Sequence, residues 1–155
     1  MSENKQFDIC IIGGCGHVGL PLGLAFAQKG KRVVLQDIHE PSTQKINNKI
    51  MPFLENGAQE ILTDVVERGL LSATTDRAVI KNSEHIIVVV GTPVDEHLNP
   101  RIHDVTRALD DVMSYFQDDQ VIILRSTLYP GTSEQIQQKF IQQGKKTGVA
   151  FCPER

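Results

Sequence analysis

The sequence predicts an α/β fold with a doubly wound, mostly parallel sheet and helices on both faces. Short runs rich in Val and Ile alternate with amphipathic stretches, which is typical of successive βαβ units. The run at residues 86–90 is apolar at every position, which indicates a strand covered on both faces. A glycine-rich segment directly follows the first run and opens a helical pattern, a third feature typical of such folds.

The elements are expected in alternating order. The expected strands lie at Phe7–Ile12, 32–36, 85–90, Val121–Leu124 and 149–151. Helical spacing of apolar residues predicts helices after the glycine-rich segment, over 58–66, over 105–116 and after Gly131. In the helix over 105–116 the apolar stripe consists of Val105, Leu109, Val112 and Phe116. This alternation favours right-handed crossovers between parallel strands.

Cap residues set the expected ends of these helices. Asp104 is the expected N-cap of the helix over 105–116. Thr132-Ser133-Glu134-Gln135 has the spacing of a capping box. Gly69 is expected to end the helix over 58–66.

Composition limits the class of protein. The chain has 155 residues, 16 of them Lys or Arg and 19 Asp or Glu, so the net charge is −3. One domain of this length buries a core without disulfides or metals. The charge offers no basic surface for nucleic acid or an anionic membrane. Because the sequence stops beside its last predicted strand, we expect residues 1–155 to be the first domain of a longer protein.

The expected compartment is the cytoplasm. The apolar stretch near the N-terminus is too short for a signal peptide or a membrane span. The three cysteines, Cys10, Cys15 and Cys152, are widely spaced and form neither a disulfide framework nor a zinc motif. Cys10 is expected in the core and Cys15 as a small filler of its loop. The histidines at 39, 85, 97 and 103 lack metal-ligand spacing, so no metal site is expected.

The glycine-rich loop reads Gly14-Cys15-Gly16-His17-Val18-Gly19 and fits the pattern G-x-G-x-x-G. The hexad alone is weak evidence, but its place between a strand and a helix is that of the dinucleotide site in a Rossmann domain. We assign the tight turn to Gly14, close approach of a pyrophosphate to Gly16, and helix–strand packing to Gly19. The helix N-terminus, with Val18, would face the phosphates. His17 either donates to a phosphate or faces solvent.

Asp37 ends the second predicted strand about 20 residues past this loop, the separation expected of a ribose-binding acid. Its carboxylate would accept hydrogen bonds from both adenosine-ribose hydroxyls and repel a 2′-phosphate. No Arg follows within several residues, so Asp37 and the adjacent Ile38 predict NAD rather than NADP. The alternative is a tight turn without a ligand and a solvent-exposed Asp37.

The segment from Pro41 to Leu70 is too long for one crossover helix. Pro52 divides it, so we expect one helix on each side. The intervening residues 51–57 have two interpretations, a mobile loop near the cofactor or a packed surface elaboration.

Three further segments lie where later strands end, at the edge where open α/β sheets bind ligands. They are Gly91-Thr92-Pro93-Val94-Asp95, Arg125-Ser126-Thr127-Leu128-Tyr129-Pro130-Gly131-Thr132 and Cys152-Pro153-Glu154-Arg155. Together with Gly16-His17-Val18-Gly19-Leu20-Pro21, they resemble the N-terminal NAD-binding domain of the UDP-glucose/GDP-mannose dehydrogenase family. That family carries Gly-Tyr-Val-Gly-Leu-Pro, Thr-Pro, Ser-Thr…Pro-Gly and Pro-Glu in this order. The resemblance covers nearly the whole chain.

The resemblance implies NAD as cofactor and two successive oxidations at C6 of a nucleotide sugar, from alcohol to carboxylate through a thiohemiacetal on a Cys. Thr127 would orient a water or the reacting oxygen beside the nicotinamide. Thr92 would touch the cofactor, with Gly91, Pro93 and Ser126 beside it. Glu154 would serve the hydrolytic step. The alternative for Thr92 and Thr127 is a capping or turn hydroxyl.

The family's nucleophilic Cys belongs to a later Gly-x-Cys motif that this sequence lacks, as it lacks the central helix and substrate domain. The chain is therefore expected to bind NAD without oxidising sugar, and the intact protein to be a homodimer or larger. Cys152-Pro153-Glu154-Arg155 is similar to the branch acting on UDP-N-acetylmannosamine or UDP-N-acetylglucosamine, whose products feed surface polysaccharides. UDP-glucose and GDP-mannose are the alternatives within the family.

Three interpretations outside the family stay open. The first is a dehydrogenase of the 6-phosphogluconate or 3-hydroxyacid type, which shares the N-terminal fold. The second is a regulatory module that senses NAD or NADH without chemistry. The third is a methyltransferase-like nucleotide binder.

Overall fold

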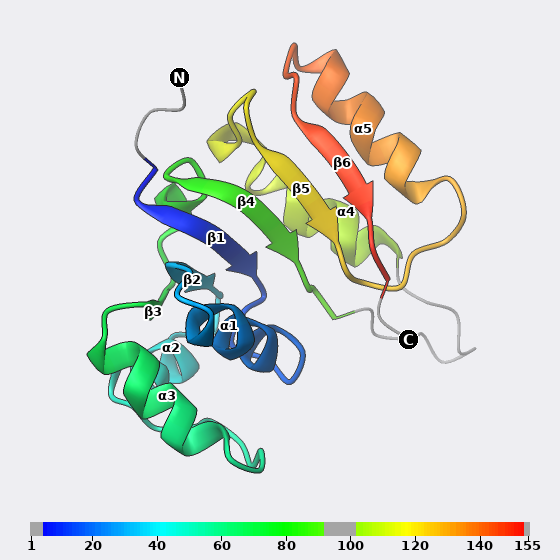
Figure 1. Ribbon diagram of the computed structural model, residues 1–155. Coiled ribbons are helices and arrows are strands. Elements are labelled where there is room, and N and C mark those ends of the chain that lie inside the picture. Colours follow the sequence, from blue (N-terminus) through cyan, green and yellow to red (C-terminus); the bar gives the residue numbers. More distant parts are fainter. Residues whose placement is uncertain (1–4, 92–101, 154–155) are drawn as a thin grey trace, which may run out of the picture.

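Six strands form one parallel sheet in the order β3-β2-β1-β4-β5-β6 (Figure 1). The computed structural model describes residues 5–91 and 102–153, and side chains there except those of 102–104. The strands are β1 (Phe7–Ile12), β2 (Val33–Gln36), β3 (Leu71–Thr74), β4 (Ser83–Val88), β5 (Val121–Leu124) and β6 (Gly148–Phe151). All five pairings are parallel, so the predicted doubly wound sheet is confirmed.

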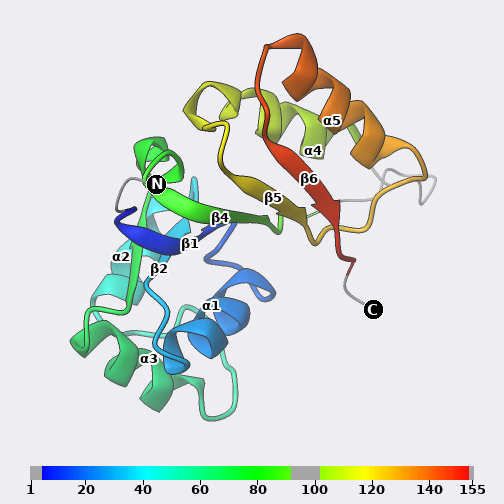
Figure 2. The same ribbon diagram turned by 45° about the horizontal axis from the view of Figure 1, so that its top comes forward.

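The helices cover both faces of this sheet, as predicted (Figure 2). They are α1 (Gly19–Gln28), α2 (Glu40–Asn47), α3 (Ala58–Glu67), α4 (Ile102–Asp110) and α5 (Thr132–Gln142), with short 3₁₀ helices η1 (Arg77–Ile80) and η2 (Met113–Tyr115). Helices α1, α2 and α3 bury their apolar residues with one face of the sheet, and η1, α4 and α5 bury theirs with the other. The two helices expected around Pro52 are α2 and α3.

Strand β1 shows why the core has two layers. Its successive side chains point to opposite faces. Ile9 and Ile11 are buried with α1 and α3, whereas Cys10 and Ile12 are buried with α4 and α5. A central strand must therefore be apolar at nearly every position, which is the pattern that predicted a parallel sheet.

Two strands differ from the expectation by more than one residue. Strand β3 was not predicted, because Leu71-Ser72-Ala73-Thr74 has only two apolar residues, and these are the two that it buries. Strand β4 spans Ser83–Val88 rather than 85–90. Ser83 extends the pairing toward the amino end because it lies opposite Phe7 of β1.

Two predicted caps were wrong. Helix α4 begins at Ile102, so Asp104 lies inside it and is not its N-cap, and the chain leaves α-helical form after Asp110. The predicted stripe of Val105, Leu109, Val112 and Phe116 is nevertheless buried in one core. The capping box at Thr132 does not form, because Gly131 (φ +88°) is the N-cap of α5 and places Thr132 inside the first turn.

Gly69 ends α3 as predicted. It adopts φ +69°, and its N–H donates to the carbonyl of Val66 at 3.0 Å. The N–H of Leu70 donates to the carbonyl of Val65 at 2.9 Å. This pair of bonds satisfies the last carbonyls of the helix and turns the chain into β3.

Candidate functional site at the carboxyl edge of the sheet

The glycine-rich loop connects β1 to α1 at the carboxyl edge of the sheet. The N–H groups of Gly13 and Gly14 donate to the carbonyl of Gln36 at 2.9 and 3.2 Å, which ties the loop to the end of β2. Gly13 adopts φ +75°, so the tight turn belongs to Gly13 rather than to Gly14 as predicted. A Cβ on Gly14 would lie 2.7 Å from the carbonyl oxygen of Ile11, so Gly14 is required by packing.

Gly19 and Gly16 are glycines for different reasons. A Cβ on Gly19 would lie 2.7 Å from the Cα of Gly14, which agrees with its predicted part in helix–strand packing. A Cβ on Gly16 would meet only the carbonyl oxygen of Gly13, at 3.9 Å. The fold itself therefore does not require glycine at 16, and the space beside it is open.

The first turn of α1 presents free backbone donors. Val18 is the N-cap and makes no side-chain cap hydrogen bond. The N–H of Leu20 donates to the carbonyl of Gly16 at 3.0 Å, but those of residues 16–19 have no protein acceptor within the described part of the chain. Pro21 stands third in the helix, where its missing N–H breaks no helical bond. Free donors at the positive end of a helix dipole favour an anion such as a pyrophosphate.

Asp37 follows β2 and is bound to the glycine loop. Its Oδ2 accepts from the N–H of Cys15 at 3.0 Å, and its Oδ1 accepts from the N–H of His39 at 3.1 Å. These two bonds fix the carboxylate in a half-buried position. Each oxygen retains a further lone pair, so the group can still accept from a diol.

Neither Cys10 nor Cys15 is a nucleophile here. Burial raises the pKa of the Cys10 thiol to about 12. Burial, with a smaller contribution from the charge of Asp37, raises the pKa of Cys15 to about 12 as well. Both residues are buried, as predicted from their positions in a strand and a packed loop. A thiol with so high a pKa carries almost no reactive thiolate at neutral pH.

A cavity of about 560 Å³ runs along this edge, within the size range of ligand pockets. Its walls include Gly16, His17, Val18, Gly19, Asp37, Ile38, Val89, Val90, Gly91, Arg77, Arg107 and Asp111. Ile38 is 85% exposed and supplies an apolar wall beside Asp37. The predicted site residues from the first two loops thus line one cavity.

A second cavity of about 280 Å³ adjoins the first. The two share Val18, Val89, Val90 and Gly91, and the second adds Arg125, Ser126 and Thr127. Ser126 Oγ donates to the carbonyl of Val90 at 2.6 Å, which ties the ends of β5 and β4 together. Thr127 is exposed at this end. Thr92, Pro93 and Glu154 lie outside the described residues.

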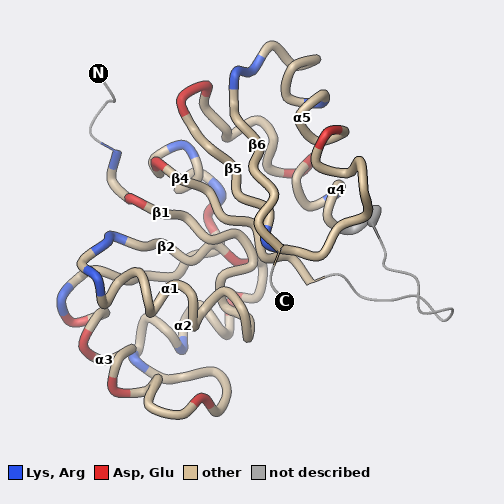
Figure 3. Tube along the Cα trace, turned by 45° about the vertical axis from the view of Figure 1, so that its right-hand side comes forward, with Lys and Arg blue, Asp and Glu red and all other residues tan. Residues whose placement is uncertain are grey.

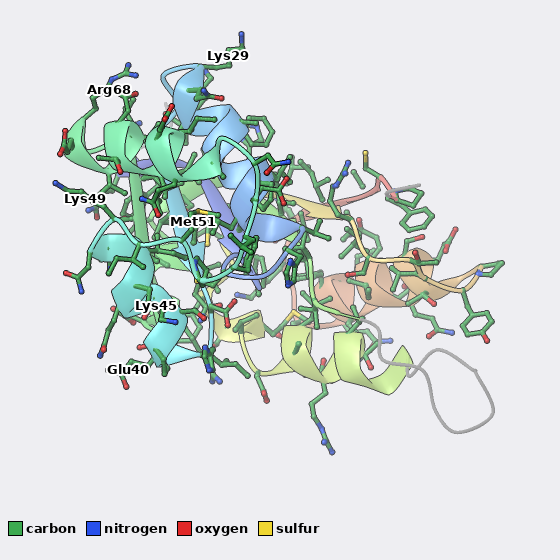
Figure 4. All side chains as sticks on the ribbon, turned by 90° about the horizontal axis from the view of Figure 1, so that it is seen from below. Lys29, Glu40, Lys45, Lys49, Met51 and Arg68 are labelled. Atoms are coloured by element: carbon green, nitrogen blue, oxygen red, sulfur yellow. The ribbon has the colours of Figure 1, made fainter. Side chains whose placement is uncertain are left out.

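The loop between α2 and α3 reaches the glycine loop. The rings of Phe53 and His17 lie 4.0 Å apart between centroids, at an angle of 31°. The N–H of Met51, which Figure 4 labels, donates to Gln59 Oε1 at 3.0 Å. Met51 and Phe53 pack against the core. Residues 51–53 are therefore packed beside the site, as one of the two interpretations has it, whereas residues 54–57 are exposed. The ring of His17 faces the ring of Phe53.

Sequence reasoning missed three residues at this edge. Arg77, Arg107 and Asp111 belong to no motif, and the fold brings Arg77 of η1 to the same cavity as the other two, which lie in α4 and directly after it. A prediction of β3 would have pointed to Arg77. That residue lies shortly after the carboxyl end of β3, as Asp37 lies directly after the carboxyl end of β2.

The remaining surface features are plain. Basic and acidic residues are interspersed along the described trace rather than gathered on one face (Figure 3). No three His, Cys, Asp or Glu side chains gather as a metal-binding group within residues 5–91 and 102–153. Over the same residues, no helix combines the length and apolar composition needed to cross a membrane.

Comparison with known proteins identifies the family of the chain. UDP-N-acetyl-D-mannosamine dehydrogenase of Methanococcus aeolicus is 30% identical over 159 residues, which cover 99% of this chain and 35% of that protein. UDP-N-acetyl-D-glucosamine 6-dehydrogenase of Pseudomonas aeruginosa is 30% identical, with 84% of this chain and 30% of that protein covered. The chain thus spans about a third of the length of its curated relatives.

Solved structures give the same result. The UDP-D-ManNAc dehydrogenase of Pyrococcus horikoshii superposes with a TM-score of 0.86 at 30% identity, covering 95% of this chain and 36% of that one. The GDP-mannose dehydrogenase of Pseudomonas aeruginosa superposes with a TM-score of 0.87 at 25% identity, covering 96% and 36%. A family model described as the UDP-glucose/GDP-mannose dehydrogenase family, NAD binding domain, matches residues 7–155. Since that match takes in nearly every residue, the chain belongs to the UDP-glucose/GDP-mannose dehydrogenase family as its NAD-binding domain.

Proposed function

We propose that the protein containing this chain is an NAD-dependent nucleotide-sugar 6-dehydrogenase. Its overall reaction converts the C6 alcohol of a UDP-N-acetylhexosamine to a carboxylate in two oxidations, and NAD held by the residues named below would supply the hydride acceptor, one NAD for each oxidation. The observation that carries this proposal is the continuous pair of cavities from Asp37, past the glycine loop, to Thr127. An extended dinucleotide fits along such an edge with its two nucleosides on either side of the helix N-terminus.

Each end of this path has its own proposed residues. The N–H groups of Gly16, His17, Val18 and Gly19 hold the pyrophosphate, and Asp37 with Ile38 holds the adenosine ribose. Gly91, Thr92, Pro93 and Ser126 are proposed as further cofactor-binding residues. Thr127 orients a water or the reacting oxygen, and Glu154 serves the hydrolytic step.

The nucleophilic Cys is proposed to lie outside residues 1–155. Two of the three cysteines, Cys10 and Cys15, are buried with a pKa of about 12. The central helix and the substrate domain would likewise lie outside this chain, and would form the homodimer or larger assembly. We place the intact protein in the cytoplasm, where it supplies uronates for surface polysaccharides.

The sugar is proposed to be UDP-N-acetylmannosamine or UDP-N-acetylglucosamine. Cys152-Pro153-Glu154-Arg155 supports this choice, together with relatives whose names carry these two substrates. UDP-glucose and GDP-mannose are the alternatives, since relatives and similar structures carry those names too. In the intact protein, NADH formation with each of the four sugars selects among them, and two NADH per sugar are expected.

Titration of the chain with NADH and NADPH, followed by nicotinamide fluorescence, tests cofactor binding. We expect NADH to bind and NADPH to bind much more weakly, because Asp37 repels a 2′-phosphate. Asp37→Ala should narrow this gap, whereas Asp64→Ala, at an exposed acid paired with Arg68, should not. Failure of the folded chain to bind NADH, or an unchanged gap in Asp37→Ala, overturns the proposed site.

A further inference from the structure

Three charged side chains in the larger cavity have no part in the proposed function so far. Arg77 lies in η1, Arg107 lies in α4, and Asp111 directly follows α4. All three line the cavity that also contains Asp37 and Ile38. None of them lines the smaller cavity that contains Thr127. Arg77, Arg107 and Asp111 therefore belong to one end of the site only.

Sheet order identifies this end as the adenosine end, given the proposed binding of NAD. The glycine loop follows β1, Asp37 follows β2 and Arg77 follows the next strand outward, β3. Thr127 follows β5, on the other side of β1. A dinucleotide with its pyrophosphate on the glycine loop and its ribose on Asp37 therefore directs its base away from Thr127, into the part of the cavity that holds Arg77, Arg107 and Asp111.

The three side chains are arranged to meet a ligand. Arg77 Nη1 donates to the backbone carbonyl of Asp111 at 3.5 Å, which joins η1 to the end of α4. Arg107 and the Asp111 carboxylate form no ion pair or side-chain hydrogen bond with any residue that the structure describes. The neighbouring Asp110 differs, because both of its oxygens accept from Lys139 Nζ at 2.8 Å.

The chemistry of this pair matches adenine. A guanidinium only donates hydrogen bonds and a carboxylate only accepts them. Adenine offers a donor, its N6 amine, next to ring nitrogens that accept. Ile38, Val90 and Ala108 line the same cavity and provide apolar surface for the faces of a flat base.

We infer that Asp111 and Arg107 read the adenine base of the cofactor. Asp111 accepts from the N6 amine, Arg107 donates to ring nitrogen N7, and Arg77 is a positioning residue that holds the end of α4. This inference rests on the proposed binding of NAD. It adds a base preference that Asp37 and the glycine loop cannot supply, because those groups contact only ribose and phosphate.

Nicotinamide hypoxanthine dinucleotide provides the test, because a carbonyl oxygen replaces the N6 amine and faces the Asp111 carboxylate. Its reduced form and NADH carry the same fluorescent nicotinamide, so one titration compares them. We expect the wild-type chain to prefer NADH about tenfold or more, the discrimination typical of a matched donor–acceptor pair on a base edge. Asp111→Asn should bring the ratio of the two affinities near one, because the Asn amide can accept from the N6 amine of adenine or donate to the carbonyl oxygen of hypoxanthine. Arg107→Gln should weaken NADH binding several-fold.

Asp110→Asn is the matched control and should leave the ratio unchanged, because Asp110 pairs with Lys139 and does not line the cavity. Equal binding of both dinucleotides to the wild type overturns the inference while the proposed function stands. A preference that survives in Asp111→Asn overturns the assignment of Asp111. Arg107→Gln is also made in the Asp37→Ala background. If it weakens NADPH binding there but leaves NADH binding unchanged, Arg107 contacts the 2′-phosphate rather than the base, and the inference fails. If the folded wild-type chain does not bind NADH at all, that result instead contradicts the proposed function.

Discussion

At both edge strands of the sheet, β3 and β6, a side-chain amide from a neighbouring helix forms hydrogen bonds with the outward-facing backbone groups. Asn47, at the end of α2, donates to the carbonyl of Ala73 at 2.7 Å and accepts from its N–H at 2.9 Å. Gln137, in α5, donates to the carbonyl of Thr147 and accepts from the N–H of Val149, both at 3.0 Å. A side-chain amide thus takes the place of a further strand at each edge, which limits pairing with other chains.

The two strands differ in what their side chains bury. In β3, Leu71 and Ala73 are buried beneath the layer of α1, α2 and α3. In β6, three of four residues are exposed, and Phe151 is 46% exposed. The sheet edge that precedes Arg77 is therefore a strand packed into the core, whereas the opposite edge, beside β5, is a strand held mainly by its backbone. Equal hydrogen bonding at two edges does not imply equal packing.

The largest expected effect comes from truncating the packed side chain. Leu71 is only 3% exposed, so Leu71→Ala leaves a cavity in the core. The substitution should lower the free energy of unfolding by about 2–5 kcal/mol. Phe151→Ala, a larger truncation on β6, should cost no more than about 1 kcal/mol. Urea denaturation of the two variants measures the difference. Equal losses would remove the contrast between the strands.

A smaller and more equal effect is expected for the two edge amides. Asn47→Ala and Gln137→Ala each remove two hydrogen bonds to an edge strand and should each lower the free energy of unfolding by about 1–2 kcal/mol. Asn48→Ala, at an exposed neighbour of Asn47, is the control and should be close to neutral. Hydrogen exchange at Ala73 and Val149 locates the loss. A cost confined to Asn47→Ala would mean that only the packed edge depends on its amide.

Thiol labelling should distinguish the buried cysteine of the glycine loop from the exposed cysteine after β6, and it requires no substitution. Cys15 is buried on the glycine-loop side and its pKa is raised to about 12, whereas Cys152 is exposed beyond β6. A thiol reagent at pH 8 should therefore modify one Cys of the folded chain quickly and leave Cys10 and Cys15. Mass spectrometry of the labelled chain identifies the site, and rapid labelling of Cys15 would show that the glycine loop opens.

The same thiols predict a loss of stability in alkali. Their folded pKa of about 12 exceeds the ordinary value of 9.0, so the folded state holds its protons more tightly than the unfolded state. The contribution is fully present below pH 9 and is lost as the pH rises from 9 toward 12. A free energy of unfolding that is constant across this range would contradict the burial of both thiols.

Sequence reasoning succeeded where one short segment carries the whole signal. The first strand, the glycine loop and Asp37 follow from local pattern and spacing, and the structure joins them through the bond from Cys15 to Asp37. It failed where tertiary packing decides. Strand β3 has too few apolar residues to stand out, and Gly131 overrode a capping box. Arg77 and Arg107 lie 30 residues apart and meet only through the fold.

The contact between His17 and Phe53 has a consequence for how this sequence can vary. Position 17 is a free position in the G-x-G-x-x-G pattern, yet its ring lies 4.0 Å from a ring that comes from the α2–α3 loop. A smaller residue at 17 would leave Phe53 without a partner, and a smaller residue at 53 would leave the His17 ring in water. The two positions, 36 residues apart, therefore form one unit of variation, and homologues should change them together.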